Sequence, residues 1–424
     1  KPSSAASDVY KRQIYDSGNN TITNNDIVDN TFGMYLESGN NLLRANTMLE
    51  NVYNFVDDII LSRWGIISQN NDVETSNTVN GKSIYYIINQ TNLNINPSTY
   101  PDMGFLVLKN CSNVIIENMK FSNNGFGIAL EKCANVTVEK TTIENNIVAV
   151  SVFKSVNIAI RNSIIQNNLH GLALVCVEPY SEISNNMIVN NTVRNLLRTV
   201  TPYFVQAMPR SIKYQLTSTL LSISGGIYIH GMNDSALLNN TVSNNERGIY
   251  LDISIHNIFK NNTMANNVYN FGQCLHYLFP IDWVGDPPDP PQISPHLIND
   301  VDASNTVDGK PIYWWINRQN EQVPSDAGYV LLVNCTNMTV KDLALQNNTQ
   351  GILLVGVSNS LISNNMIKNT AFGIVIHTHF NVNPSTNNKI TRNNITGSGI
   401  GIRAGCPFSI ISVSYTHLTL PTKA

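Results

Sequence analysis

Residues 127–171 read GIALEKCANVTVEKTTIENNIVAVSVFKSVNIAIRNSIIQNNLHG, and this stretch decides the fold. Within it, Gly127, Ala149 and Gly171 stand 22 residues apart, and the residues between them repeat slot for slot. Glycines elsewhere keep the same interval: Gly226 and Gly248, Gly351 and Gly373. A period in the twenties is the signature of a solenoid, in which each repeat stacks on its neighbours and cannot bury its apolar face alone.

Apolar and polar residues alternate inside each repeat, as in Val136-Thr137-Val138, and Ile143 follows before Asn145-Asn146. Such alternation indicates short strands, since successive side chains of a strand point to opposite faces. Asn and Gly suit the corners between strands because both tolerate left-handed backbone angles. Asn at one slot of successive turns can also form amide ladders along the axis. The sequence therefore predicts an all-β fold, a right-handed parallel β-helix with three strands per turn.

Other repeat architectures fit the pattern less well. A helical solenoid needs apolar residues at three- and four-residue spacing, whereas this chain alternates. Leucine-rich repeats have a similar period, but their fixed Leu frame and Asn/Cys position are absent.

The repeat predicts one elongated β-helix domain over residues 14–412, with insertions where the pattern stops. These insertions fall at about 49–103, 192–224 and 271–328. Residues 1–13 and 413–424 fit no repeat slot and resemble translated adaptor sequence, so we expect non-native tails there.

The composition limits the classes of partner that the chain is expected to bind. Charged residues make up 13 % of the chain and the net charge is −3, which argues against nucleic-acid binding, since that function needs a clustered basic surface. No apolar run is long enough to predict a membrane span within the sequence. Nothing in the pattern indicates an oligomeric state.

Two of the six cysteines share a slot. Cys111 and Cys133 are 22 residues apart, and Ser155 takes the same slot in the next turn. One strand spacing lies within the Cα range that a disulfide allows. Two interpretations stay open: a ladder of small residues that fills the turn, and a disulfide.

A large unit occurs twice. NDVETSNTVNGKSIYYIINQ (71–90) matches NDVDASNTVDGKPIYWWINR (299–318), and similar segments flank both copies. The pattern therefore predicts an internal duplication of residues 33–150 and 248–370.

These duplicated residues carry a family resemblance. The Asn-Thr-Val-Asn/Asp-Gly-Lys-x-Ile-Tyr segment, then Asn-Cys-x-Asn, then Gly-Ile-x-Leu with Asn-Asn corners, resembles NosD-type β-helix proteins with a CASH domain. The Asn-rich form is similar to cell-surface proteins of methanogenic archaea. The resemblance implies the β-helix fold and an extracytoplasmic location. It leaves function open, because members of the family assist copper-site maturation or act on polysaccharide, and fold alone does not define function.

In a β-helix, functional side chains are expected at the repeat positions that point outward, because the inward positions pack the core. With Ile227 and Ile229 facing in, Tyr228 and His230 face out, and one turn later Tyr250 and Asp252 occupy the same slots. The corresponding slots of the first copy hold Tyr35 and Glu37. Exposed aromatic rings one strand apart could pack against sugar rings, with the carboxylates binding hydroxyl groups. The alternative is that the tyrosines only stabilise the sheet face as a cross-strand pair.

Two histidine groups are candidate metal ligands. His377 and His379 lie two residues apart on one predicted strand, and His230, His256 and Asp252 could form a second cluster. Imidazoles on one face suit copper or zinc, and copper would agree with the NosD resemblance. The alternative is an exposed histidine pair without a metal.

Catalysis has less support in the sequence. Glycosidases need two carboxylates at a defined separation, and no such pair lies on a shared outward strand. Pectate lyases gather several Asp residues for calcium, and no such series lies along one slot. The leading hypothesis is therefore a non-catalytic module of a secreted or cell-surface protein that binds carbohydrate or contributes to an envelope layer. Its expected partners are polysaccharide or cell-envelope components. The alternatives are a NosD-like accessory protein for copper and a polysaccharide lyase or hydrolase.

Overall fold

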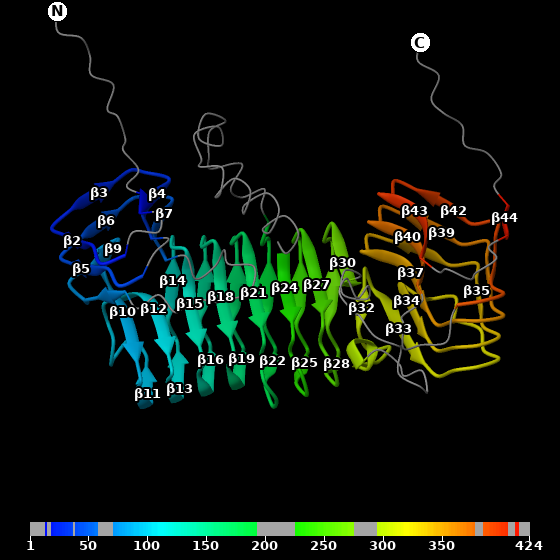
Figure 1. The fold of residues 1–424 in the computed structure, drawn as a ribbon, viewed down its shortest axis with the longest axis horizontal. Coiled ribbons are helices and arrows are strands. Elements are labelled where there is room, and N and C mark those ends of the chain that lie inside the picture. Colours follow the sequence, from blue (N-terminus) through cyan, green and yellow to red (C-terminus); the bar gives the residue numbers. More distant parts are fainter. Residues whose placement is uncertain are drawn as a thin grey trace, which may run out of the picture.

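The fold was analysed in a computed structural model that describes residues 13–14, 18–36, 39–57, 71–192, 225–274, 295–377, 385–405 and 412–414. Within these residues the chain is a right-handed parallel β-helix, as predicted, with three sheets around each core. The coils form three consecutive stacks, which we name the N-terminal, central and C-terminal sections (Figure 1).

The N-terminal section contains strands β1 to β9. Its sheet 1 holds β1 (Gln13–Ile14), β4 (Phe32–Leu36) and β7 (Tyr53–Asp57). Its sheet 2 holds β2 (Thr21–Thr23), β5 (Leu42–Arg44) and β8 (Asp72–Val73). Its sheet 3 holds β3 (Asp26–Val28), β6 (Thr47–Leu49) and β9 (Thr78–Val79).

The central section contains β10 to β32. Its sheet 1 holds β10 (Lys82–Ile88), β12 (Met103–Lys109), β15 (Phe126–Glu131), β18 (Val148–Phe153), β21 (His170–Val175), β24 (Gly225–His230), β27 (Arg247–Asp252) and β30 (Tyr269–Gln273). Its sheet 2 holds β11 (Thr91–Ile95), β13 (Ser112–Glu117), β16 (Ala134–Glu139), β19 (Val156–Arg161), β22 (Glu182–Ser184), β25 (Ala236–Leu238), β28 (Ile258–Lys260) and β31 (Asp300–Val301). Its sheet 3 holds β14 (Lys120–Ser122), β17 (Thr142–Glu144), β20 (Ile164–Gln166), β23 (Met187–Val189), β26 (Thr241–Ser243), β29 (Thr263–Ala265) and β32 (Thr306–Val307).

The C-terminal section contains β33 to β44. Its sheet 1 holds β33 (Lys310–Ile316), β34 (Tyr329–Val333), β37 (Gln350–Val355), β40 (Phe372–His377) and β43 (Ile400–Gly405). Its sheet 2 holds β35 (Thr339–Lys341), β38 (Leu361–Ser363), β41 (Lys389–Thr391) and β44 (Ser412–Ser414), and its sheet 3 holds β36 (Ala344–Gln346), β39 (Met366–Lys368) and β42 (Asn394–Thr396). A short 3-10 helix, η4 (Pro295–Leu297), precedes β31. No helix among the described residues has the length and apolar character needed to cross a bilayer.

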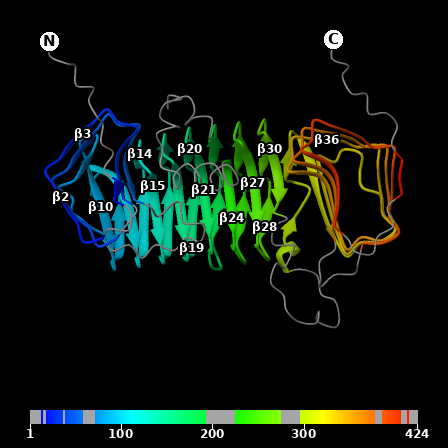
Figure 2. The same cartoon turned by 45° about the horizontal axis from the view of Figure 1, so that its top comes forward.

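The duplicated sequence segment forms the joints between sections. At each joint an antiparallel hairpin, β9–β10 or β32–β33, reverses the chain. Its two turn residues, Asn80-Gly81 or Asp308-Gly309, all have positive φ, as a two-residue type I′ turn requires. Sheet 3 of one section thereby continues into sheet 1 of the next, and the stack changes direction (Figures 1 and 2).

The first strand after each hairpin has a hydrophobic core on both faces. In β33, Trp314 packs into the core of the central section, whereas Trp315 packs against the core of the C-terminal section. In β10, Tyr86 faces the core of the N-terminal section and Tyr85 that of the central section. The ranges 49–103 and 271–328, expected as insertions, thus contain these joint strands. The range 192–224 lies almost wholly outside the described residues.

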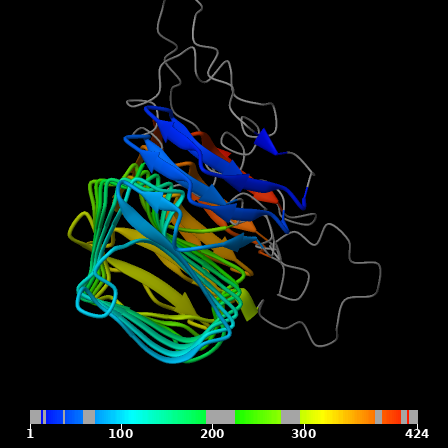
Figure 3. The ribbon, with the colours of Figure 1, turned by 90° about the vertical axis from the view of Figure 1, so that its left-hand side faces the viewer.

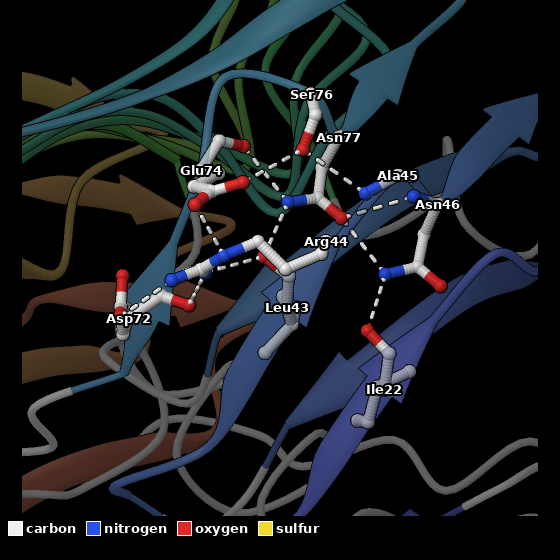
Figure 4. A network of polar contacts seen from close by, with 9 residues as sticks. All are labelled: Ile22, Leu43, Arg44, Ala45, Asn46, Asp72, Glu74, Ser76 and Asn77. Atoms are coloured by element: carbon white, nitrogen blue, oxygen red, sulfur yellow. Dashed lines mark hydrogen bonds and ion pairs between the residues drawn. The ribbon is translucent and has the colours of Figure 1, made fainter.

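Buried asparagines hold the coils in register. Asn146 is fully buried, its Oδ1 accepts from the N–H of Asn124, and its Nδ2 donates to Asn168 Oδ1 and to the carbonyl of Glu144. The N-terminal section uses the same arrangement, with Asn46 bonded to Asn77 (Figure 4). Nearby, Arg44 pairs with Asp72 and Glu74 and closes the outer side of that corner. The predicted amide ladders are therefore present.

The cysteine slot forms a ladder of small residues. Cys111 and Cys133 are free and buried, and their Sγ atoms lie 3.3 Å from the carbonyl oxygens of Ile87 and Leu108. Ser155 continues the slot by accepting from the N–H of Cys133.

We expect Asn146→Ala to lower the free energy of unfolding by about 3 kcal/mol, because it leaves buried donors and acceptors of Asn124 and Glu144 without partners. Urea denaturation followed by circular dichroism measures this. Asn94→Ala is the control, since Asn94 is exposed in β11, and its change should stay within about 0.5 kcal/mol. Equal losses in both variants would contradict a stabilising role for the buried ladder.

Candidate functional site

Two columns of outward residues run across sheet 1 of the central section. Strand pairing places Tyr228 beside Tyr250 and His230 beside Asp252, which confirms the register predicted from the 22-residue period. The inward neighbours Ile227, Ile229, Ile249 and Leu251 are buried. We call Tyr228, His230, Tyr250 and Asp252, together with the adjoining Arg247, the tyrosine face.

The aromatic rings of this face are stacked. The rings of Tyr228 and Tyr250 lie 6.3 Å apart at 19°, and those of Tyr228 and His230 lie 6.4 Å apart at 17°. The guanidinium of Arg247 lies 4.5 Å from the centre of the Tyr250 ring. Burial raises the pKa of the Tyr250 phenol, so this hydroxyl stays protonated at neutral pH. Tyr228 and Tyr250 are both partly exposed.

Asp252 is the polar centre of the face. Its side chain is 4 % exposed although it occupies an outward slot. Its Oδ2 lies 2.9 Å from His230 Nδ1 and accepts from the Tyr228 hydroxyl at 3.4 Å, while its Oδ1 is buried without a hydrogen-bond partner. The contact with Asp252 holds the His230 ring in one orientation on the face. The Asp252 carboxylate itself is enclosed by protein.

Two residues that the sequence reading missed adjoin this centre. Cys274 follows β30, extends the His230–Asp252 column and interacts with Tyr250. His296, in η4, has a buried Nδ1 without a partner, and burial lowers its pKa, with Asp252 acting in the opposite direction. Cys274 could have been found from the period, since it lies 22 residues after Asp252. No spacing rule reaches His296.

The first copy of the duplication does not present a second exposed tyrosine. Tyr35 is only 5 % exposed, so the expectation that it faces solvent is wrong. The physical reason is that the N-terminal section packs on the outer surface of central sheet 1 (Figure 3). Tyr35 and Val56 share one hydrophobic cluster with Ala129 and Val148. Glu37 lies outside the described residues.

Three of the histidine candidates, His230, His256 and His377, lie within the described residues. His377 ends β40, pairs in register with Val355 and is 2 % exposed, while His379 lies outside the described residues. His256 is half-exposed and lies 3.3 Å from Asp234, so it pairs with that carboxylate instead. The described part of the chain holds no group of three or more His, Cys, Asp or Glu side chains arranged to bind a metal ion.

Two family models match the sequence. The model described as periplasmic copper-binding protein (NosD) matches residues 207–277 and 311–409, and the right-handed β-helix region model matches residues 60–208. The resemblance to NosD-type β-helix proteins is therefore confirmed over these ranges. No curated protein matches the chain.

Solved β-helix structures resemble the chain weakly. The mannuronan C-5 epimerase AlgE4 A-module of Azotobacter vinelandii is 10 % identical over 92 % of this chain and 90 % of that one, with a TM-score of 0.33. The DFA-IIIase of Arthrobacter chlorophenolicus A6 in complex with GF2 is 9 % identical over 84 % and 68 %, with a TM-score of 0.31. The catalytic domain of a GH87 α-1,3-glucanase in complex with tetrasaccharides is 14 % identical over 88 % and 63 %, with a TM-score of 0.33. Likeness at this level says nothing about what this chain does.

The different burial of the two tyrosines gives a stability prediction. We expect Tyr35→Ala to lower the free energy of unfolding by about 4 kcal/mol, since it opens a cavity between two sections. Tyr228→Ala should cost about 1 kcal/mol, because its ring is partly exposed. Urea midpoints of the two variants and of the unmodified chain provide the comparison. A larger loss for Tyr228→Ala would contradict the packing described for Tyr35.

Proposed function

We propose that the chain is an extracytoplasmic β-helix module of a secreted or cell-surface protein that binds polysaccharide on the tyrosine face. The observation that carries the proposal is the pair of stacked, partly exposed rings of Tyr228 and Tyr250 beside the partly exposed imidazole of His230. The NosD match, whose description names a periplasmic protein, supports the location.

The chemistry of the face suits a sugar ligand. A pyranose ring has an apolar C–H surface and a rim of hydroxyl groups, so it needs an apolar platform with a few directed polar groups. The tyrosine rings supply the platform. The imidazole of His230, held in place by its bond to the buried Asp252, supplies a directed polar group. The coil stack keeps these side chains at fixed positions on strands, which limits the entropy lost on binding.

Binding of the full-length chain to a glycan array tests the proposal. We expect at least one polysaccharide to bind, and Tyr228→Ala to weaken that binding about tenfold or more, as aromatic anchors of an interface do. Tyr180→Ala is the matched control, because Tyr180 is 78 % exposed and belongs to a turn away from the face. The proposal fails if no polysaccharide binds, or if the two variants weaken binding equally.

Copper handling is a second candidate, favoured by the NosD match. Imidazole and thiol groups suit copper, and His230, Cys274 and His296 all lie near Asp252. The described residues do not form a ready set of three ligands, so these side chains fit a bound metal poorly as they stand.

Copper titration decides this candidate. If it is right, the His230→Ala/Cys274→Ser variant should take up one copper fewer than the unmodified chain, and His377→Ala/His379→Ala tests the pair predicted from sequence. His256→Ala should take up as much copper as the unmodified chain, since His256 pairs with Asp234. Equal uptake by all four proteins would exclude a copper site at these residues.

A further inference from the structure

We infer that the ligand of the tyrosine face is an acidic polysaccharide, whose anionic group is bound by Arg247. The inference rests on the proposed function and adds the substrate class. It comes from the position and surroundings of the Arg247 guanidinium. Strict alternation of side chains along β27 would place Arg247 on the inward face, together with Ile249.

Arg247 is held by aromatic rings and not by a carboxylate. Its guanidinium carbon lies 4.5 Å from the centre of the Tyr250 ring and 5.9 Å from that of Tyr269. Arg247 is partly exposed, and among the described residues it forms no ion pair. A guanidinium that lies over an aromatic face keeps its N–H groups pointing outward in its own plane, where they can bind a carboxylate or sulfate bidentately.

Other arginines of the chain show the contrast. Arg44 pairs with Asp72 and Glu74, Arg161 pairs with Glu139, and Arg318 pairs with Glu321. Arg318 also lies over an aromatic ring, that of Trp315, at 4.8 Å. An arginine can therefore lie over an aromatic ring and still pair with a carboxylate, as Arg318 does. Arg247 lies over a ring and has no carboxylate partner among the described residues.

The duplication supplies an internal comparison. Phe32 takes the place of Arg247 in the first copy, because Phe32 pairs with Tyr53 as Arg247 pairs with Tyr269. There the three rings of Phe32, Tyr35 and Tyr53 pack together, and Tyr35 is buried against the central section. The copy with the buried face has an apolar residue in this slot, and the copy with the partly exposed face has a cation.

The two charged residues of the face come from opposite ends of one strand. Arg247 and Asp252 begin and end β27, so their Cα atoms lie about 16 Å apart at the usual rise per residue. The Asp252 carboxylate is buried beside His230. An acidic sugar can therefore place its anionic group at Arg247 and its hydroxyl groups at His230 without meeting an exposed negative charge.

Isothermal titration of the full-length chain with polygalacturonate and with its fully methyl-esterified form tests the inference, because esterification removes the negative charges and adds only a methyl group to each carboxyl. We expect the unesterified polymer to bind about tenfold to a hundredfold more tightly. Arg247→Gln should reduce its affinity to that of the ester. Arg318→Gln, which removes the same charge from another arginine that lies over a ring, should leave both affinities unchanged. A sulfated dextran beside plain dextran shows whether sulfate replaces carboxylate.

The outcomes separate the two proposals. Equal affinity for acid and ester, with no effect of Arg247→Gln, would overturn the inference while leaving polysaccharide binding intact. Binding of neutral glycans alone on the array would do the same. Failure of every polysaccharide, acidic or neutral, would overturn the proposed function itself. Equal losses in Arg247→Gln and Arg318→Gln would assign the effect to net charge and reject a specific site.

Discussion

The bonding of buried asparagine amides at the corners is the constraint on which the structure depends. A polar amide inside the protein is costly unless its donors and acceptors are used, and a coil shifted by one residue would leave many of them unused. The series Asn146, Asn168, Asn191 and Asn245 shows the effect, since Asn191 bonds directly to Asn245 across the 54 residues that separate them. Coils that are distant in sequence are thereby held one strand apart.

The joints use the same constraint to change direction. Asn267 bonds to Asn270 instead of to a further coil, and Asn51 bonds to Asn54 in the same way. Each series of amides thus ends where a section ends, and the following hairpin starts a new stack. Because sheet 3 of one section becomes sheet 1 of the next, this sheet has no unpaired edge at the joint. This geometry leaves the tyrosine face near the second joint.

Much of this could be read from the sequence, and the remainder has identifiable physical reasons. The 22-residue period gives the neighbours of a residue within one stack, so the pairing of Tyr228 with Tyr250 was predictable. It says nothing about how stacks pack on one another, which is why the burial of Tyr35 was missed. Alternation alone also does not predict the position of Arg247 over the Tyr250 ring, because residues at the start of a strand can leave the alternating pattern. The Asn-Gly turn signal was present in the duplicated segment, but its role in redirecting the stack depends on contacts made by both faces of β10.

The asparagines with left-handed backbone angles affect how the cellular location of such a protein can be inferred from its sequence. Asn135, near the start of β16, and Asn239, just before β26, both adopt positive φ, and each is followed two residues later by a threonine in a strand. The resulting Asn-x-Thr triplets match the acceptor motif for N-glycosylation. Here turn geometry selects the asparagine and strand propensity favours the threonine, without any need for a glycan. The number of such motifs therefore counts corners, and it carries no information about whether the chain meets a glycosylation enzyme.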